Sequence, residues 1–254
     1  MAERQNTPPI VLLHALGVDA SMWDATRQVL EESGHTALAP DLRGFGSAPL
    51  GEEPPSLDVS VDDLARLLDQ HRIERAVIAG CSMGGYVAMG FLARHRDRVQ
   101  ALALLSTRAR ADEPAEKDGR EMFATLMATP DRAAGVIAAA SLKLVGATTR
   151  AQRSDVFERV RALAAESAPA SLAWAQRAIA ARPDFVPALR AATVPALVLA
   201  GTEDELISAQ DHRQIAEALP QGRVTWLDGV GHLPPMESPD RVAAELSRLI
   251  DETR

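Results

Sequence analysis

Short apolar runs rich in Val, Leu and Ile alternate along this 254-residue chain with longer amphipathic stretches. Runs of this kind, separated by helical segments, are typical of a parallel sheet that is covered on both faces. The pattern therefore predicts an α/β fold with a mostly parallel, doubly wound sheet. The expected strands are Ile10–His14, Thr36–Pro40, Ala76–Cys81, Val99–Leu105, Ala196–Gly201 and Arg223–Leu227.

The alternation stops between residues 107 and 192, where no strand-like run occurs and Ala-rich helical segments follow one another. We interpret this stretch as a helical cap inserted into a core formed by residues 1–106 and 193–254. A chain of this length could also hold two small domains. Because it has no long linker and no internal repeat, one domain with an insertion is the preferred interpretation.

Two helices of the core have start signals. Ser60 is followed three residues later by Asp63, and apolar residues then recur at helical spacing. Ser238 stands directly before Pro239. Serine is a favoured N-cap residue and proline fits the first helical turn, so this pair predicts the start of the last helix.

Composition excludes several classes of partner. Asp and Glu total 35 against 27 Lys and Arg, and a net charge of −8 would repel a nucleic-acid backbone. The single cysteine, Cys81, can form no internal disulfide, and no His or Cys lies clustered near it for a metal site. The apolar stretch after Met1–Pro9 is too short for a signal peptide or a membrane span. We therefore expect a cytoplasmic protein with no metal, membrane or nucleic-acid partner.

The segment Gly80-Cys81-Ser82-Met83-Gly84 directly follows an apolar run and opens a helical one. This is a G-x-S-x-G pattern in the strand-turn-helix context of a nucleophile elbow. A sharp turn there would hold the Ser82 hydroxyl out into a cleft, and the N–H of Met83 would point toward a developing oxyanion. Cys81 is read as a small buried hydrophobic residue.

A serine nucleophile needs a base and an orienting carboxylate. His232 lies in a Gly-rich loop after the last predicted strand, and Asp204 lies just past the strand before it, where sheet clefts form. Glu203 and Asp228 are competing acids. Of the other histidines, His14 has either a structural role or a role in substrate binding, and the remainder are expected on the surface: His35, His71, His95 and His212.

The order Ser82, Asp204, His232 is the order of a catalytic triad in the α/β-hydrolase fold family, which this chain resembles along nearly its whole length. Further matching segments are His14–Gly17, Asp41–Gly46 and Gly231–Pro235. The stretch Leu13–Asp24 is similar to enol-lactone hydrolases and related small carboxylesterases. The resemblance implies that the backbone N–H of Leu16 is a second oxyanion-hole donor beside that of Met83.

Two departures from the family pattern have structural consequences. Ala15 stands where relatives usually carry Gly, which could constrain the loop that holds Leu16. Relatives usually begin with a strand hairpin, and the segment Met1–Pro9 is too short to supply it. The sheet edge is then either exposed or covered by a partner, such as a second copy in a homodimer.

The sequence thus predicts a serine hydrolase that cleaves a carboxylic ester, lactone or related acyl bond of a small molecule through an acyl-enzyme. The alternatives are perhydrolase, lyase or thioesterase chemistry on the same triad, or a non-catalytic protein that binds a small ligand. The Gly-rich turns match no nucleotide fingerprint, so no cofactor is implied. Apolar residues of the insertion either pack its helices together or line a pocket. We assign to substrate binding Trp23, Met122, Phe123 and Trp174.

Overall fold

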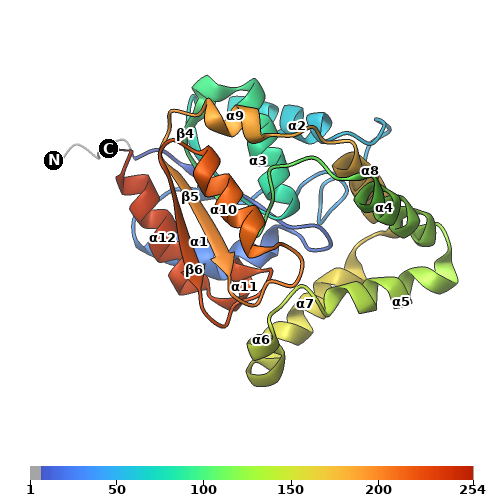
Figure 1. Cartoon of the computed structure of the whole chain (residues 1–254). Coiled ribbons are helices and arrows are strands. Elements are labelled where there is room, and N and C mark those ends of the chain that lie inside the picture. The colour runs from blue at the N-terminus through green and yellow to red at the C-terminus, as the bar shows by residue number, and fades with distance from the viewer. Residues whose placement is uncertain (1–6, 254) are drawn as a thin grey trace.

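The apolar runs form one parallel sheet in the computed structural model, which describes residues 7–253 (Figure 1). Its strand order is β2-β1-β3-β4-β5-β6. The strands are β1 (Ile10–Leu13), β2 (Ala37–Leu38), β3 (Ala76–Cys81), β4 (Val99–Leu105), β5 (Ala196–Gly201) and β6 (Gly222–Leu227). The order runs outward in both directions from β1 and β3, as expected for a doubly wound sheet, and places the end of β3 near the middle.

The edge strand β2 is shorter than the sequence pattern predicts. The run Thr36–Pro40 was expected, but only Ala37 and Leu38 pair with β1. An edge strand has one neighbour, and Pro40 has no N–H to extend the ladder. Residues 1–6 of the segment Met1–Pro9 lie outside the described part of the chain.

Both faces of the sheet are buried under helices. Val11 and Leu13 belong to the hydrophobic cluster on one face, whereas Ile10 and Leu12 belong to the cluster on the other. This alternation follows from the two-residue period of a strand. The first face is covered by α2 (Leu57–Gln70), α3 (Met83–Arg94) and α10 (Ala209–Ala218), and the second by α1 (Asp24–Glu32) and α12 (Pro239–Asp251) (Figure 1).

Of the two predicted helix starts, the one for the last helix is confirmed and the other is wrong. The last helix, α12, begins at Pro239 after Ser238, as expected. Helix α2 begins earlier than predicted, because the Oγ of Ser56 accepts a hydrogen bond from the N–H of Asp58 and caps the helix there. Ser60 therefore lies inside α2 and is not its N-cap.

All regular elements of the segment between β4 and β5 are helices. Helix α4 packs against α8, and α5 packs against α7, beyond the sheet and away from α1 and α12 (Figure 1). These helices are α4 (Pro114–Met127), α5 (Pro130–Ser141), α6 (Ala147–Gln152), α7 (Ser154–Glu166), α8 (Pro169–Ala180) and α9 (Val186–Arg190). Shorter elements are the 3₁₀ turns Ala20–Trp23 and Arg96–Arg98 and helix α11 (Pro234–Glu237). Within residues 7–253, no helix is both long and apolar enough to cross a bilayer.

Candidate active site

Ser82 occupies the turn between β3 and α3 in a strained backbone conformation, with φ of 52° and ψ of −110°. Glycine is required two residues before and two residues after Ser82, because a side chain at either position would not fit. A Cβ atom on Gly80 would lie 2.2 Å from the carbonyl oxygen of Gly84, and one on Gly84 would lie 2.3 Å from the carbonyl oxygen of Leu13. Close approach of strand and helix therefore forms the sharp turn that exposes the Ser82 hydroxyl.

The structure brings together the side chains of Ser82, His232 and Asp204. The Ser82 Oγ lies 2.9 Å from His232 Nε2, and His232 Nδ1 lies 3.0 Å from each carboxylate oxygen of Asp204. The geometry fits an imidazole whose Nδ1–H donates to Asp204 while Nε2 accepts from the hydroxyl. This is the arrangement in which a neutral histidine can take up the hydroxyl proton.

Asp204 is held as a buried anion. Burial opposes its ionisation, but the charge and hydrogen bond of His232 outweigh burial, together with the N–H groups of Leu206 and Ile207, and lower the pKa of Asp204 to about 2. The two N–H donors lie 2.8 and 3.1 Å from Oδ1. The carboxylate is therefore ionised at every pH at which histidine can act as a base.

The lowered pKa of Asp204 predicts a loss of stability in acid. Its stabilising contribution is complete above the unfolded-state value of 3.8 and is lost as the pH falls toward about 2. We expect the difference in unfolding free energy between the wild type and Asp204→Asn to shrink by about 1 kcal/mol between pH 5 and pH 3. Urea titrations at both pH values measure this difference. A gap that stays constant with pH would argue against the ionised, paired carboxylate.

The competing acids point elsewhere. The carboxylate of Glu203 accepts hydrogen bonds from the N–H and hydroxyl of Thr148, at 2.7 and 2.5 Å. Asp228 is exposed. Among the three candidate acids, Asp204 alone contacts His232.

The remaining histidines divide into structural and surface groups. His14 is fully buried; its Nδ1 donates to the carbonyl of Ala15 at 2.8 Å, and its Nε2 accepts from the N–H of Leu42 at 2.8 Å. Burial lowers the pKa of His14, so the neutral ring bridges two loops. The expectation of surface positions is wrong for His35 and His212, which are buried; His212 packs edge-on against Trp226.

Two backbone N–H groups near Ser82 are available as donors. Within residues 7–253, neither the N–H of Leu16 nor that of Met83 makes a hydrogen bond to another group of the protein. The N–H of Gly84 donates to the carbonyl of His14 at 3.1 Å and so ties the two segments together. Ala15 does not have the positive φ that would require glycine, so it fits this loop without backbone strain.

The cleft over Ser82 has a volume of about 530 Å³ and is lined by residues from the core and from the insertion. Of the residues that the sequence assigned to substrate binding, Phe123 lines it. Trp23 does not, because it is buried against the opposite face of the sheet, and Met122 is 62% exposed to solvent. Neighbouring residues on a helix point about 100° apart, which separates Met122 from Phe123. Trp174 is also outside the cleft, with its indole N–H bonded to the carbonyl of Glu53 at 2.8 Å.

Sequence reasoning missed Glu237, a buried carboxylate beside the histidine loop. Its oxygens accept hydrogen bonds from the N–H groups of Gly231 and Leu233, the residues on either side of His232, at 3.0 and 3.2 Å. The same carboxylate accepts from the N–H of Gly146 and the hydroxyl of Thr149 at the start of α6. Glu237 therefore joins the histidine loop to the insertion, and nothing in its sequence spacing marks this role.

For the ester hydrolysis that the sequence predicts, we expect Glu237→Gln to lower kcat by about tenfold or more, because an amide accepts fewer of these hydrogen bonds and lets His232 shift. KM should change less, since Glu237 does not line the cleft. Steady-state kinetics separates the two effects. Glu205→Gln is the control, because Glu205 is exposed and pairs with Arg150 on the surface. Equal kcat values for the two variants would contradict a positioning role for Glu237.

No group of His, Cys, Asp and Glu side chains among residues 7–253 is arranged to hold a metal ion. Cys81 is buried and free, and burial raises the pKa of its thiol well above the ordinary value. A protonated, enclosed thiol fits the expected packing role.

Comparison with known proteins identifies the family. The model of the Alpha/beta hydrolase family matches residues 10–245. An esterase from Thermogutta terrifontis is 33% identical, with a TM-score of 0.92 over 97% of this chain and 90% of that one. The enol-lactonase from Burkholderia xenovorans LB400 is 29% identical, with a TM-score of 0.87 over 98% and 93%. Pimeloyl-[acyl-carrier protein] methyl ester esterase from Aromatoleum aromaticum is 27% identical over 96% of this chain and 99% of that protein.

These matches confirm the predicted fold, and the relatives include several esterases. Since the family model covers most of the chain, the protein belongs to the alpha/beta hydrolase family of enzymes.

Proposed function

We propose that this protein is a serine hydrolase that cleaves a carboxylic ester or lactone bond of a small acyl compound through an acyl-enzyme. The proposal is carried by the hydrogen-bonded series from Ser82 through His232 to Asp204. Ser82 and His232 both line the cleft, so a ligand bound there meets the hydroxyl and the imidazole together. The similarity to an esterase and to an enol-lactonase supports this choice of bond.

In the proposed mechanism, Ser82 Oγ attacks the acyl carbon while His232 Nε2 accepts the hydroxyl proton. Asp204 stabilises the imidazolium that forms. The N–H groups of Leu16 and Met83 stabilise the oxyanion. Loss of one such donor raises the activation free energy by about 3 kcal/mol. His232 then protonates the departing alkoxide as its bond to the acyl carbon breaks.

Deacylation repeats this sequence with water. His232 removes a proton from the attacking water molecule and returns it to Ser82 Oγ as the bond between serine and the acyl group breaks. The products are a carboxylic acid and an alcohol, or a hydroxy acid when the substrate is a lactone. Besides the substrate and water, these steps use side chains and backbone groups of the protein.

An acyl-trapping experiment tests this function. Brief mixing with p-nitrophenyl acetate followed by acid quench should leave an acetyl group on the peptide that contains Ser82, detected by mass spectrometry. A burst of p-nitrophenol should accompany it. Turnover without any acylated Ser82 would contradict the acyl-enzyme, and turnover that requires hydrogen peroxide would indicate perhydrolysis.

A further inference from the structure

The charged side chains that line the cleft are all cationic. Arg108, Arg120 and Lys143 line it together with Ser82 and His232, and no Asp or Glu of the described chain does. This contrasts with the whole protein, which carries a net charge of −8. A positive cleft in an acidic protein indicates an anionic ligand.

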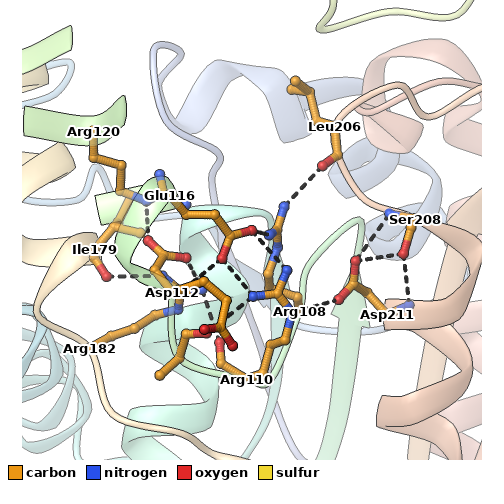
Figure 2. Close-up of polar contacts among 12 residues, drawn as sticks. Arg108, Arg110, Asp112, Glu116, Arg120, Ile179, Arg182, Leu206, Ser208 and Asp211 are labelled. Carbon is orange, nitrogen blue, oxygen red and sulfur yellow. Dashed lines mark hydrogen bonds and ion pairs between the residues drawn. The ribbon is translucent and has the colours of Figure 1, made fainter. Parts of the chain in front are cut away.

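Arg108 lies between the nucleophile turn and the loop of Asp204. The preceding residue, Thr107, donates its hydroxyl proton to the carbonyl oxygen of Ser82 at 3.0 Å. The Nη2 of Arg108 donates to the carbonyl of Leu206 at 3.1 Å, as Figure 2 shows. Its Nε is buried and has no hydrogen-bond partner among the described residues. The guanidinium also pairs with Glu116 through Nη1, so it is fixed at the wall of the cleft while its Nε–H has no partner within residues 7–253.

Arg120 reaches the cleft from α4 and is also held in place. Its Nε pairs with Asp112, and its Nη1 donates to the side chain of Gln176 at 2.8 Å. Asp112 also pairs with Arg182 at 2.7 Å, and both of those side chains are fully buried (Figure 2). The carboxylate that neutralises Arg120 therefore lies behind the cleft wall, and Gln176 lines the cleft beside the guanidinium.

The ion-pair cluster to which Arg108 and Arg120 belong has more positive than negative groups. Its ion pairs link four guanidinium groups with three carboxylates, the latter being Asp112, Glu116 and Asp211 (Figure 2). The guanidinium groups are those of Arg108, Arg110, Arg120 and Arg182. Partly buried cations are costly without a counter-charge, so the cluster favours one further anion at its open side.

We propose that the acyl substrate carries a carboxylate away from the bond that Ser82 attacks, and that Arg108 and Arg120 bind this carboxylate in the cleft. This assignment rests on the proposed function. A carboxylate brings one negative charge, which matches the single excess positive charge of the cluster, and guanidinium groups suit its planar geometry. The substrate is then a monoester, or a lactone, of a short acid that keeps a second carboxylate throughout the reaction.

Lys143 extends the positive lining at the exposed side of the cleft and makes no ion pair within the described chain. The chain has one other lysine, Lys117, which is exposed on α4 and does not line the cleft. The two lysines form a matched pair of test and control positions.

The test compares charged and neutral esters of the same acids. The monomethyl and dimethyl esters of succinate, glutarate and adipate are assayed by methanol release. We expect the wild type to prefer at least one monomethyl ester in kcat/KM by about 10- to 100-fold over its dimethyl counterpart. Equal or better cleavage of all dimethyl esters would overturn the carboxylate site while leaving the proposed hydrolase function intact.

Substitution of the cationic residues shows which side chains cause the preference for monomethyl esters. The ratio of monomethyl to dimethyl kcat/KM should fall about tenfold or more in Arg108→Gln and less in Arg108→Lys, which keeps the charge. It should fall about two- to fivefold in Lys143→Gln, because that group is exposed, and stay unchanged in Lys117→Gln. An unchanged ratio in Arg108→Gln would overturn the assignment of the site.

Binding of the free dicarboxylates to Ser82→Ala, measured by calorimetry, gives a readout that does not depend on turnover. We expect at least one dicarboxylate to bind, and to bind about tenfold more weakly when Arg108→Gln is added. If no ester is cleaved but this binding is seen, the carboxylate site stands and the hydrolase function fails. No binding, or tighter binding of inorganic phosphate than of every dicarboxylate, would overturn the carboxylate assignment.

Discussion

Ser82→Ala is expected to reduce the rate of ester hydrolysis by a factor on the order of 10⁴ to 10⁶, because among the described residues only the Ser82 hydroxyl is hydrogen-bonded to His232 Nε2. The remaining rate would come from the oxyanion donors and from binding alone. Release of p-nitrophenol from p-nitrophenyl acetate, measured at substrate saturation, checks this prediction.

The variant should fold normally, since alanine removes only the hydroxyl of a side chain that the strained turn holds outward. Circular dichroism and thermal unfolding are the controls. Ser47→Ala provides a matched replacement at an exposed serine outside the cleft. Folded Ser82→Ala protein with more than a tenth of wild-type activity would contradict Ser82 as the nucleophile.

Gly84→Ala is expected to lower the free energy of unfolding by about 3 to 5 kcal/mol, because the added Cβ would lie 2.3 Å from the carbonyl oxygen of Leu13. The clash is with backbone, so rotation of a side chain cannot relieve it. For a chain of this size the loss corresponds to a fall of about 10 °C in Tm. Calorimetry or urea titration measures the change.

Gly119→Ala is the control for the same chemical change in a helix. Gly119 lies in α4, and apart from its chain neighbours and its own helix backbone an added Cβ would have no atom within 4 Å. This replacement should stabilise the protein by about 0.5 to 1 kcal/mol, since alanine loses less backbone entropy than glycine. If Gly84→Ala were as stable as Gly119→Ala, the close packing of α3 against the end of β1 would be wrong.

The sequence predicts best the parts of the fold that local physics alone determines. The bounds of β3, β4 and β5 match the prediction because these central strands are apolar on both faces. The edge strand β2 is shorter than predicted, and α2 starts earlier than predicted. At those positions several residues could end a strand or cap a helix, and tertiary contacts choose between them.

The meeting of three side chains in the cleft could be predicted from the sequence because each follows a predicted strand. Parallel strands end at one edge of the sheet, so Ser82, Asp204 and His232 were expected to meet there. The same rule could have indicated Arg108, which lies three residues beyond the end of β4. Its role was missed because an arginine in a loop is usually solvated.

The residues that the insertion contributes to the cleft could not be predicted. Met122 and Phe123 are neighbours of similar hydrophobicity, and only the rotation of α4 about its axis decides which one faces inward. That rotation is set by packing of α4 against α8. Glu237 was missed for a related reason, since two of its four partners, Gly146 and Thr149, lie in a segment that is distant in sequence.

Labelling with a fluorophosphonate tests the central claim most directly, because the reagent reacts with a serine only when a base activates the hydroxyl. We expect the wild type to gain one adduct, mapped by peptide mass spectrometry to Ser82, and His232→Ala to react far more slowly. A wild-type protein that stays unlabelled, or is labelled at another residue, would contradict the account.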